Sequence, residues 1–244
     1  MSIPGLHSWI RRGLGLFCIL VLSLVILRMS TSQTGSLTEH YMTLSYLSRH
    51  DTKPISTEAV CTFFPLLAFL YLLQDFQLGR VCANINLLYR QANLACRAAA
   101  SLWLLAIFVF AFSVLECLSS LIVGITFGGS APQGAHLPAM VITRTFALLI
   151  AAQLENVFSL LVRPPFAFVA ITALLLGIFV LAERMLAQTP TPAQSFVPLL
   201  QLIGFAHGTS TGLSLPTATG YVMQCALLHV IFSHVLRTKD HTGA

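Results

Sequence analysis

The sequence predicts an all-α membrane protein, a bundle of about six transmembrane helices with a re-entrant segment between helices five and six. Hydrophobic residues make up 56% of the chain and charged residues only 9%, and the mean hydropathy is +0.83. Soluble domains carry about 25% charged residues, so this chain lacks the charge to cover a water-exposed surface. Its 244 residues accommodate six spans of roughly 20 residues with short connections.

The six spans form one transmembrane domain and are predicted at about residues 10–30, 59–74, 98–127, 137–162, 166–187 and 220–237. The first follows Arg11 and Arg12, and no Ala-x-Ala cleavage site comes after it, so we expect a retained span rather than a signal peptide. Segment 31–58 is rich in Ser, Thr and mixed charges, which is typical of an exterior loop. Counts of five or seven spans also fit the pattern.

Breaks in the apolar pattern separate the later spans. Arg163-Pro164-Pro165 predicts a tight interior turn, because a proline pushes the residue before it out of the helical region. Within segment 196–216, the apolar piece is too short to cross a bilayer, which is typical of a re-entrant or interfacial segment. Gly204, Gly208 and Gly212 recur there every four residues, a spacing that permits close helix packing.

The basic residues predict the orientation. Eight of the thirteen Lys and Arg residues fall in segments assigned to the interior and five lie on or near the outside. Cytoplasmic loops retain Lys and Arg, so we expect a multi-pass plasma-membrane protein with both termini in the cytoplasm.

Segment 78–97 predicts an amphipathic helix beneath the membrane. Val81, Ile85 and Leu88 recur at helical spacing on one face, whereas Arg90 and Arg97 lie on roughly the opposite face. A solvated loop held to anionic lipid by its arginines is the alternative.

The order of these elements resembles the membrane subunits of ABC exporters of the type-2 permease class, especially small ones of bacterial peptide-export and immunity systems. An Asp75-x-x-x-Gly79 exit from span two, then Tyr89-Arg90, then a very long span carries the resemblance. The resemblance implies that segment 78–97 is a coupling helix, and that Asp75, Gly79, Arg80, Tyr89 and Arg90 contact a cytoplasmic ATP-binding subunit.

The resemblance further implies a permease that exports a peptide or hydrophobic small molecule and pairs with a second, identical or related, permease subunit. The chain lacks the G-x-x-x-x-G-K-[ST] pattern that cradles phosphates, so ATP and Mg²⁺ are expected on the partner and no cofactor on this chain. The alternative is a non-catalytic accessory or scaffold subunit of a membrane complex.

Polar residues within the spans are the candidate pathway residues, because intramembrane charges are costly and point to function. They are Glu116, Arg144, Gln153 and Glu155. Glu116 and Arg144 both lie in the outer halves of their spans, so an ion pair that joins two helices is one expectation and contact with cargo is the other. Arg163 lies two turns beyond Glu155, where it could approach that carboxylate.

Other classes of function have weaker support. Basic residues are not clustered as in a nucleic-acid site, and the six cysteines, which form no CxxC pair, suit apolar helices. His229 and His234 lie about 140° apart around a helix, so no metal site is expected. Ser210 satisfies G-x-S-x-G, but the motif works at a strand-to-helix turn that is not predicted here. A serine hydrolase pairing Ser210 with a histidine would be the enzyme alternative; we expect no enzyme.

Overall fold

The structure is a computed structural model that describes residues 13–15, 17–18, 94–126, 137–186, 198 and 213–242. These residues are helical apart from short connections, and the described part contains no strand. Four long helices account for nearly all of it: α5 (Leu94–Thr126), α6 (Leu137–Leu161), α7 (Pro164–Leu186) and α9 (Leu215–Thr242). Spans one and two, most of segment 78–97 and nearly all of segment 196–216 lie outside the described residues.

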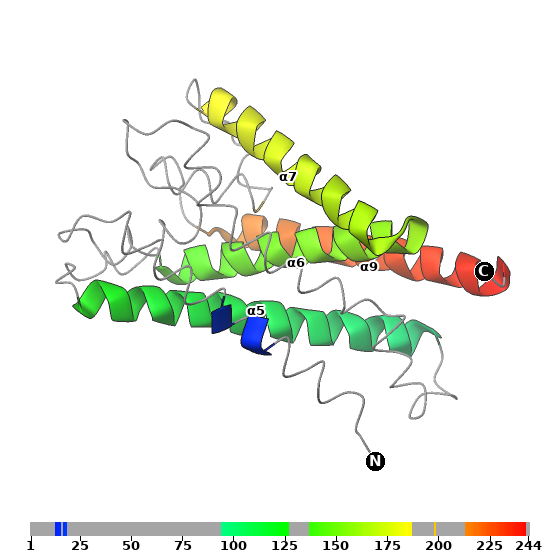
Figure 1. Ribbon diagram of the computed structural model, residues 1–244, viewed down its shortest axis with the longest axis horizontal. Helices are drawn as coiled ribbons and strands as arrows, with labels where there is room; N and C mark the ends of the chain where they lie inside the picture. Colours follow the sequence, from blue (N-terminus) through cyan, green and yellow to red (C-terminus); the bar gives the residue numbers. More distant parts are fainter. Residues whose placement is uncertain are drawn as a thin grey trace, which may run out of the picture.

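Helix α6 is the centre of the arrangement, with α5, α7 and α9 packed against it and α5 also in contact with α9 (Figure 1). Helices α5 and α6 are antiparallel, because Ala98 near the start of α5 packs in one core cluster with Val157 near the end of α6. Helix α9 runs parallel to α6. The ring of Tyr221 packs against that of Phe146 in a tilted arrangement, and further along both helices Phe232 packs in one core cluster with Val157. The directions therefore alternate along the chain, as successive membrane spans would.

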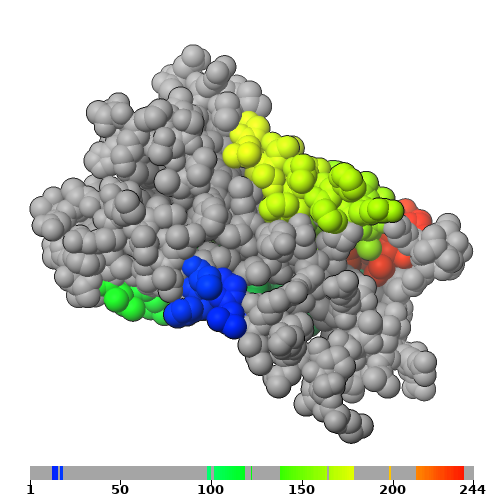
Figure 2. Space-filling view, in the orientation of Figure 1, coloured from blue at the N-terminus to red at the C-terminus, as the bar shows by residue number. Residues whose placement is uncertain are grey.

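The connection between α6 and α7 is as tight as the sequence predicts. Helix α6 ends at Leu161, and α7 begins at Pro164 after only two residues. The carbonyl of Arg163 accepts hydrogen bonds from the backbone N–H groups of Phe166 at 3.0 Å and Ala167 at 3.1 Å. Proline suits the first turn of a helix because N–H groups there have no intrahelical acceptor. Helix α7 then runs at an angle to α6 (Figure 1). Its side chains lie at the molecular surface on the face shown in Figure 2.

Helix α7 begins two residues earlier than the sequence predicts, and helices α5 and α9 begin four and five residues earlier. Helix α5 already includes Leu94–Arg97, which the sequence assigned to the end of the cytoplasmic segment. Helix α9 begins at Leu215, inside the predicted re-entrant segment, because Ser214 caps it. The Ser214 Oγ accepts a hydrogen bond from the Thr217 N–H at 3.3 Å and lies 2.7 Å from the Thr217 hydroxyl.

Within the described ranges, two helical segments, Pro138–Leu161 and Leu215–Thr238, are long and apolar enough to cross a membrane. Each has 24 residues, which corresponds to about 36 Å of helix against a hydrocarbon core of about 30 Å. Leu102–Leu118 and Pro165–Ile178 are shorter apolar stretches within α5 and α7.

The described helices expose apolar side chains and bury polar ones. Exposed large apolar residues include Trp103, Ile107, Phe166, Val169, Leu227 and Val230. The largest side chain among the fully buried ones is that of Arg144, and Glu116, Gln153 and Glu155 are also buried. An apolar core accompanies these buried polar groups. Large apolar side chains on the surface together with charged side chains in the interior suit surrounding hydrocarbon better than water.

Candidate functional site

The polar residues that the sequence places within the spans divide into three positions on the bundle. Arg144 meets Glu116 between α6 and α5. Gln153 lines a pocket between three helices. Glu155 lies two residues further along α6, about 200° around the helix from Gln153.

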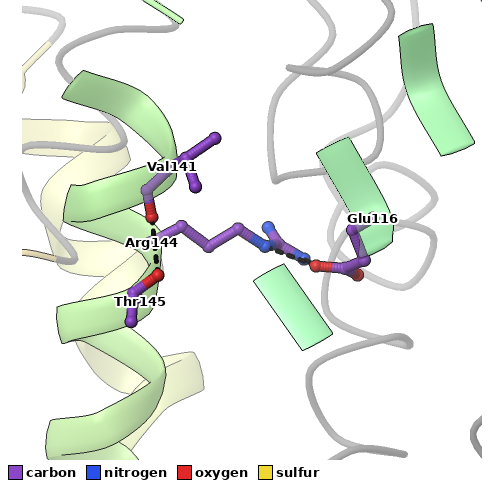
Figure 3. Close-up of polar contacts among 4 residues, drawn as sticks. All are labelled: Glu116, Val141, Arg144 and Thr145. Carbon is purple, nitrogen blue, oxygen red and sulfur yellow. Dashed lines mark hydrogen bonds and ion pairs between the residues drawn. The ribbon is translucent and has the colours of Figure 1, made fainter. Parts of the chain in front are cut away.

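Arg144 and Glu116 form a buried ion pair between α6 and α5 (Figure 3). The Nε atom of Arg144 donates to Oε2 of Glu116 at 2.7 Å, and its Nη2 atom lies 2.6 Å from the same oxygen. Both side chains are 1% exposed. Two donors from a charged guanidinium make a short, strong contact in a low-dielectric interior. The interhelical pair that the sequence suggested is therefore present.

The two threonines that flank Arg144 each pair their hydroxyl group with a backbone carbonyl of α6. Thr143 Oγ1 donates to the carbonyl of Ala139, and Thr145 Oγ1 donates to the carbonyl of Val141, each at 2.8 Å. The second contact is visible beside the ion pair (Figure 3). Such bonds to the carbonyl four residues back allow threonine to lie in an apolar helix. From this turn of α6, the side chain of Arg144 extends to Glu116 of α5.

Gln153 brings a second polar cluster together, about 13 Å further along α6 from Arg144. It lies three residues before Asn156 and therefore on nearly the same face of α6. Both residues border a small pocket together with His229 of α9. The sequence analysis did not anticipate this position of His229, which it weighed as a metal ligand and as a histidine that could pair with Ser210. The one available signal was the Gln153-x-x-Asn156 spacing, which identifies a polar face but not the helix opposite.

Glu155 is buried without a countercharge in the described part of the chain. Its side chain is 2% exposed, and its Oε1 atom has no hydrogen-bond partner. Arg163, two turns away, is exposed in the α6–α7 turn, and among the described residues no ion pair joins the two. The suggested approach of Arg163 to Glu155 is not observed.

Replacing Glu155 with glutamine is therefore expected to leave the stability of the folded chain unchanged or to raise it by about 1 kcal/mol, because a neutral amide costs less to bury than an unpaired carboxylate. Thermal unfolding of the detergent-solubilised protein, followed by loss of monodispersity in size-exclusion chromatography, measures this. The matched control is Glu116→Gln, which removes the same charge from the ion pair and should lower stability. A large loss of stability with Glu155→Gln would show that the carboxylate has a partner after all.

Most of the remaining predicted site residues fall in parts of the chain that the structure does not describe. Asp75, Gly79, Arg80, Tyr89 and Arg90 lie outside the described residues, as do Gly204, Gly208, Gly212 and Ser210. His229 is half-buried and His234 exposed. Within the described ranges, no three His, Cys, Asp or Glu side chains gather in a way that could hold a metal ion.

Comparison of the chain with protein families, with curated proteins and with solved structures finds no match.

Proposed function

We propose that this chain is the membrane-spanning subunit of an ABC transporter of the type-2 exporter class, which exports a peptide or hydrophobic small molecule with energy from ATP hydrolysed by a separate subunit. The observation that supports a membrane role is the buried Arg144–Glu116 pair inside helices whose outer faces are apolar. Intramembrane charges are retained where they serve packing, gating or transport.

Helix α5 supplies the mechanical link in this proposal. It runs without a break from Leu94 to Thr126 and begins within the segment that would bind the ATPase. From Leu94 to Glu116 the helix extends about 33 Å. Closure of the ATPase dimer would push on segment 78–97, and α5 would carry this displacement as a rigid rod to Glu116. The ion pair would then pass it to α6, the helix that the other three contact.

The complete proposal includes six spans, a re-entrant segment at 196–216 and both termini in the cytoplasm. It also includes a second permease subunit, because an ATPase dimer presents two docking sites. Asp75 and Gly79 would form the exit from span two, and Arg90 would pair with an acidic groove on the ATPase. The alternation of helix directions from α5 to α9 agrees with this topology.

Purification of the tagged chain in a mild detergent tests the proposal. We expect a nucleotide-binding subunit to co-purify in a stoichiometric amount and the complex to hydrolyse ATP. Arg90→Glu should release that subunit and reduce transport to background, because the reversed charge would repel an acidic groove.

Arg237→Glu is the matched control, since it reverses an exposed arginine near the end of α9 that lies outside the proposed contact. It should leave the complex intact. A chain that purifies alone, or within a complex that has no ATP-binding component, would overturn the proposal in favour of an accessory or scaffold subunit.

A further inference from the structure

A pocket of about 20 Å³ lies where α5, α6 and α9 meet. Its apolar wall includes Ala98 and Leu105 of α5 and Phe232 of α9, and its polar residues are Gln153, Asn156 and His229. Ala98 and Phe232 also belong to the core cluster with Val157. The pocket therefore has a packed apolar layer beside it on the side where α6 ends.

The amide of Gln153 is the reason to expect a ligand in this pocket. The side chain is 5% exposed, and both Nε2 and Oε1 are buried without a hydrogen-bond partner among the residues that the structure describes. A primary amide has two donors and an acceptor oxygen with two lone pairs. Leaving such groups unpaired in a low-dielectric interior is costly, so a ligand that pairs with them would be held firmly.

The size and chemistry of the pocket select the ligand. A water molecule needs a pocket of at least about 10–15 Å³ and two to four polar partners. The pocket meets the first condition for one water and is far below the roughly 300 Å³ of an organic-ligand site. Gln153, Asn156 and His229 line the pocket and carry the polar groups that could meet the second condition.

We infer that the pocket binds a single water molecule, which bridges Gln153 on α6 to His229 on α9, with Asn156 as its third partner. A water-mediated bridge is nearly as favourable in enthalpy as a direct hydrogen bond. Because the water can shift within the pocket, the bridge tolerates small changes in the separation of α6 and α9. The inference stands independently of the transport proposal, since it depends only on these three helices.

Nuclear magnetic resonance of the full chain in lipid nanodiscs, with ¹⁵N label in glutamine side chains, tests the inference. Loss of one signal pair in Gln153→Met assigns the Gln153 side-chain amide. We expect this amide to show a cross-peak to water with the sign of a dipolar contact rather than of chemical exchange. Absence of such a cross-peak in the wild-type protein would overturn the inference without the use of any further variant.

Two histidine variants then test the bridge. His229→Phe should weaken the cross-peak at least threefold, because it removes one of the water's partners, whereas His229→Gln should retain it. His234→Phe is the matched control, since His234 lies five residues further along α9 and is exposed; it should leave the cross-peak unchanged. A cross-peak of equal strength in His229→Phe would show that the water does not bridge to α9.

Discussion

Arg144→Leu is expected to destabilise the folded chain by about 3–5 kcal/mol, because it leaves the Glu116 carboxylate buried without its counter-charge. Both side chains are 1% exposed, and both nitrogen contacts converge on one oxygen of Glu116. The lost attraction is only part of the effect. Most of it comes from desolvation of the remaining carboxylate, which water cannot readily reach between α5 and α6. Thermal unfolding in detergent or nanodiscs measures the change.

Two further variants separate the charge from the packing. In the double variant Glu116→Leu/Arg144→Leu no charge remains unpaired, so we expect most of the lost stability to return. Arg163→Leu removes an exposed arginine from the α6–α7 turn and should change stability by no more than about 0.5 kcal/mol. If Arg144→Leu alone were as stable as the wild-type protein, the ion pair would not contribute to the joining of the two helices.

Leu227→Asp is expected to reduce membrane insertion of the chain by a large factor, because it places a charge against hydrocarbon near the middle of α9. Leu227 is 62% exposed on the surface of the described bundle. An aspartate at the centre of a membrane helix costs about 2.5–3.5 kcal/mol, which corresponds to a factor of roughly 70–370 in an equilibrium constant at 1.36 kcal/mol for each tenfold change. The amount of a fluorescent fusion in the membrane fraction, with its elution profile, measures the effect.

Leu227→Ala is the matched control, since it removes the same contacts without adding a charge, and it should insert nearly as well as the wild-type chain. The size of the aspartate effect shows whether this surface faces lipid or water. On a surface exposed to water, Leu227→Asp would change stability by about 0.5 kcal/mol or less. Normal insertion and folding of Leu227→Asp would thus contradict the assignment of α9 as a lipid-facing span.

The amino-acid sequence was enough to predict that the described part of the chain is helical and to locate those helices to within about five residues. Helix α6 was expected at 137–162 and observed at Leu137–Leu161; α7 was expected at 166–187 and observed at Pro164–Leu186. Local physics sets these bounds: in hydrocarbon the backbone must bond to itself, and the prolines after Arg163 end one helix and begin another. The largest difference, the earlier start of α9, reflects the Ser214 cap, a local signal that the sequence analysis did not use.

The Arg144–Glu116 pair could also be anticipated, because a charge of each sign in the outer halves of neighbouring spans has few other partners. The shared pocket that Gln153 and Asn156 line with His229 could not. Asn156 and His229 lie 73 positions apart in the chain. Helical periodicity defines a polar face of α6 without showing which other helix packs against it. The packing of α9 parallel to α6, which brings His229 to the same pocket as that face, is visible in the folded structure alone. The rotation of each helix depends on how side chains fill the space between all three, and that packing is a property of the assembled bundle.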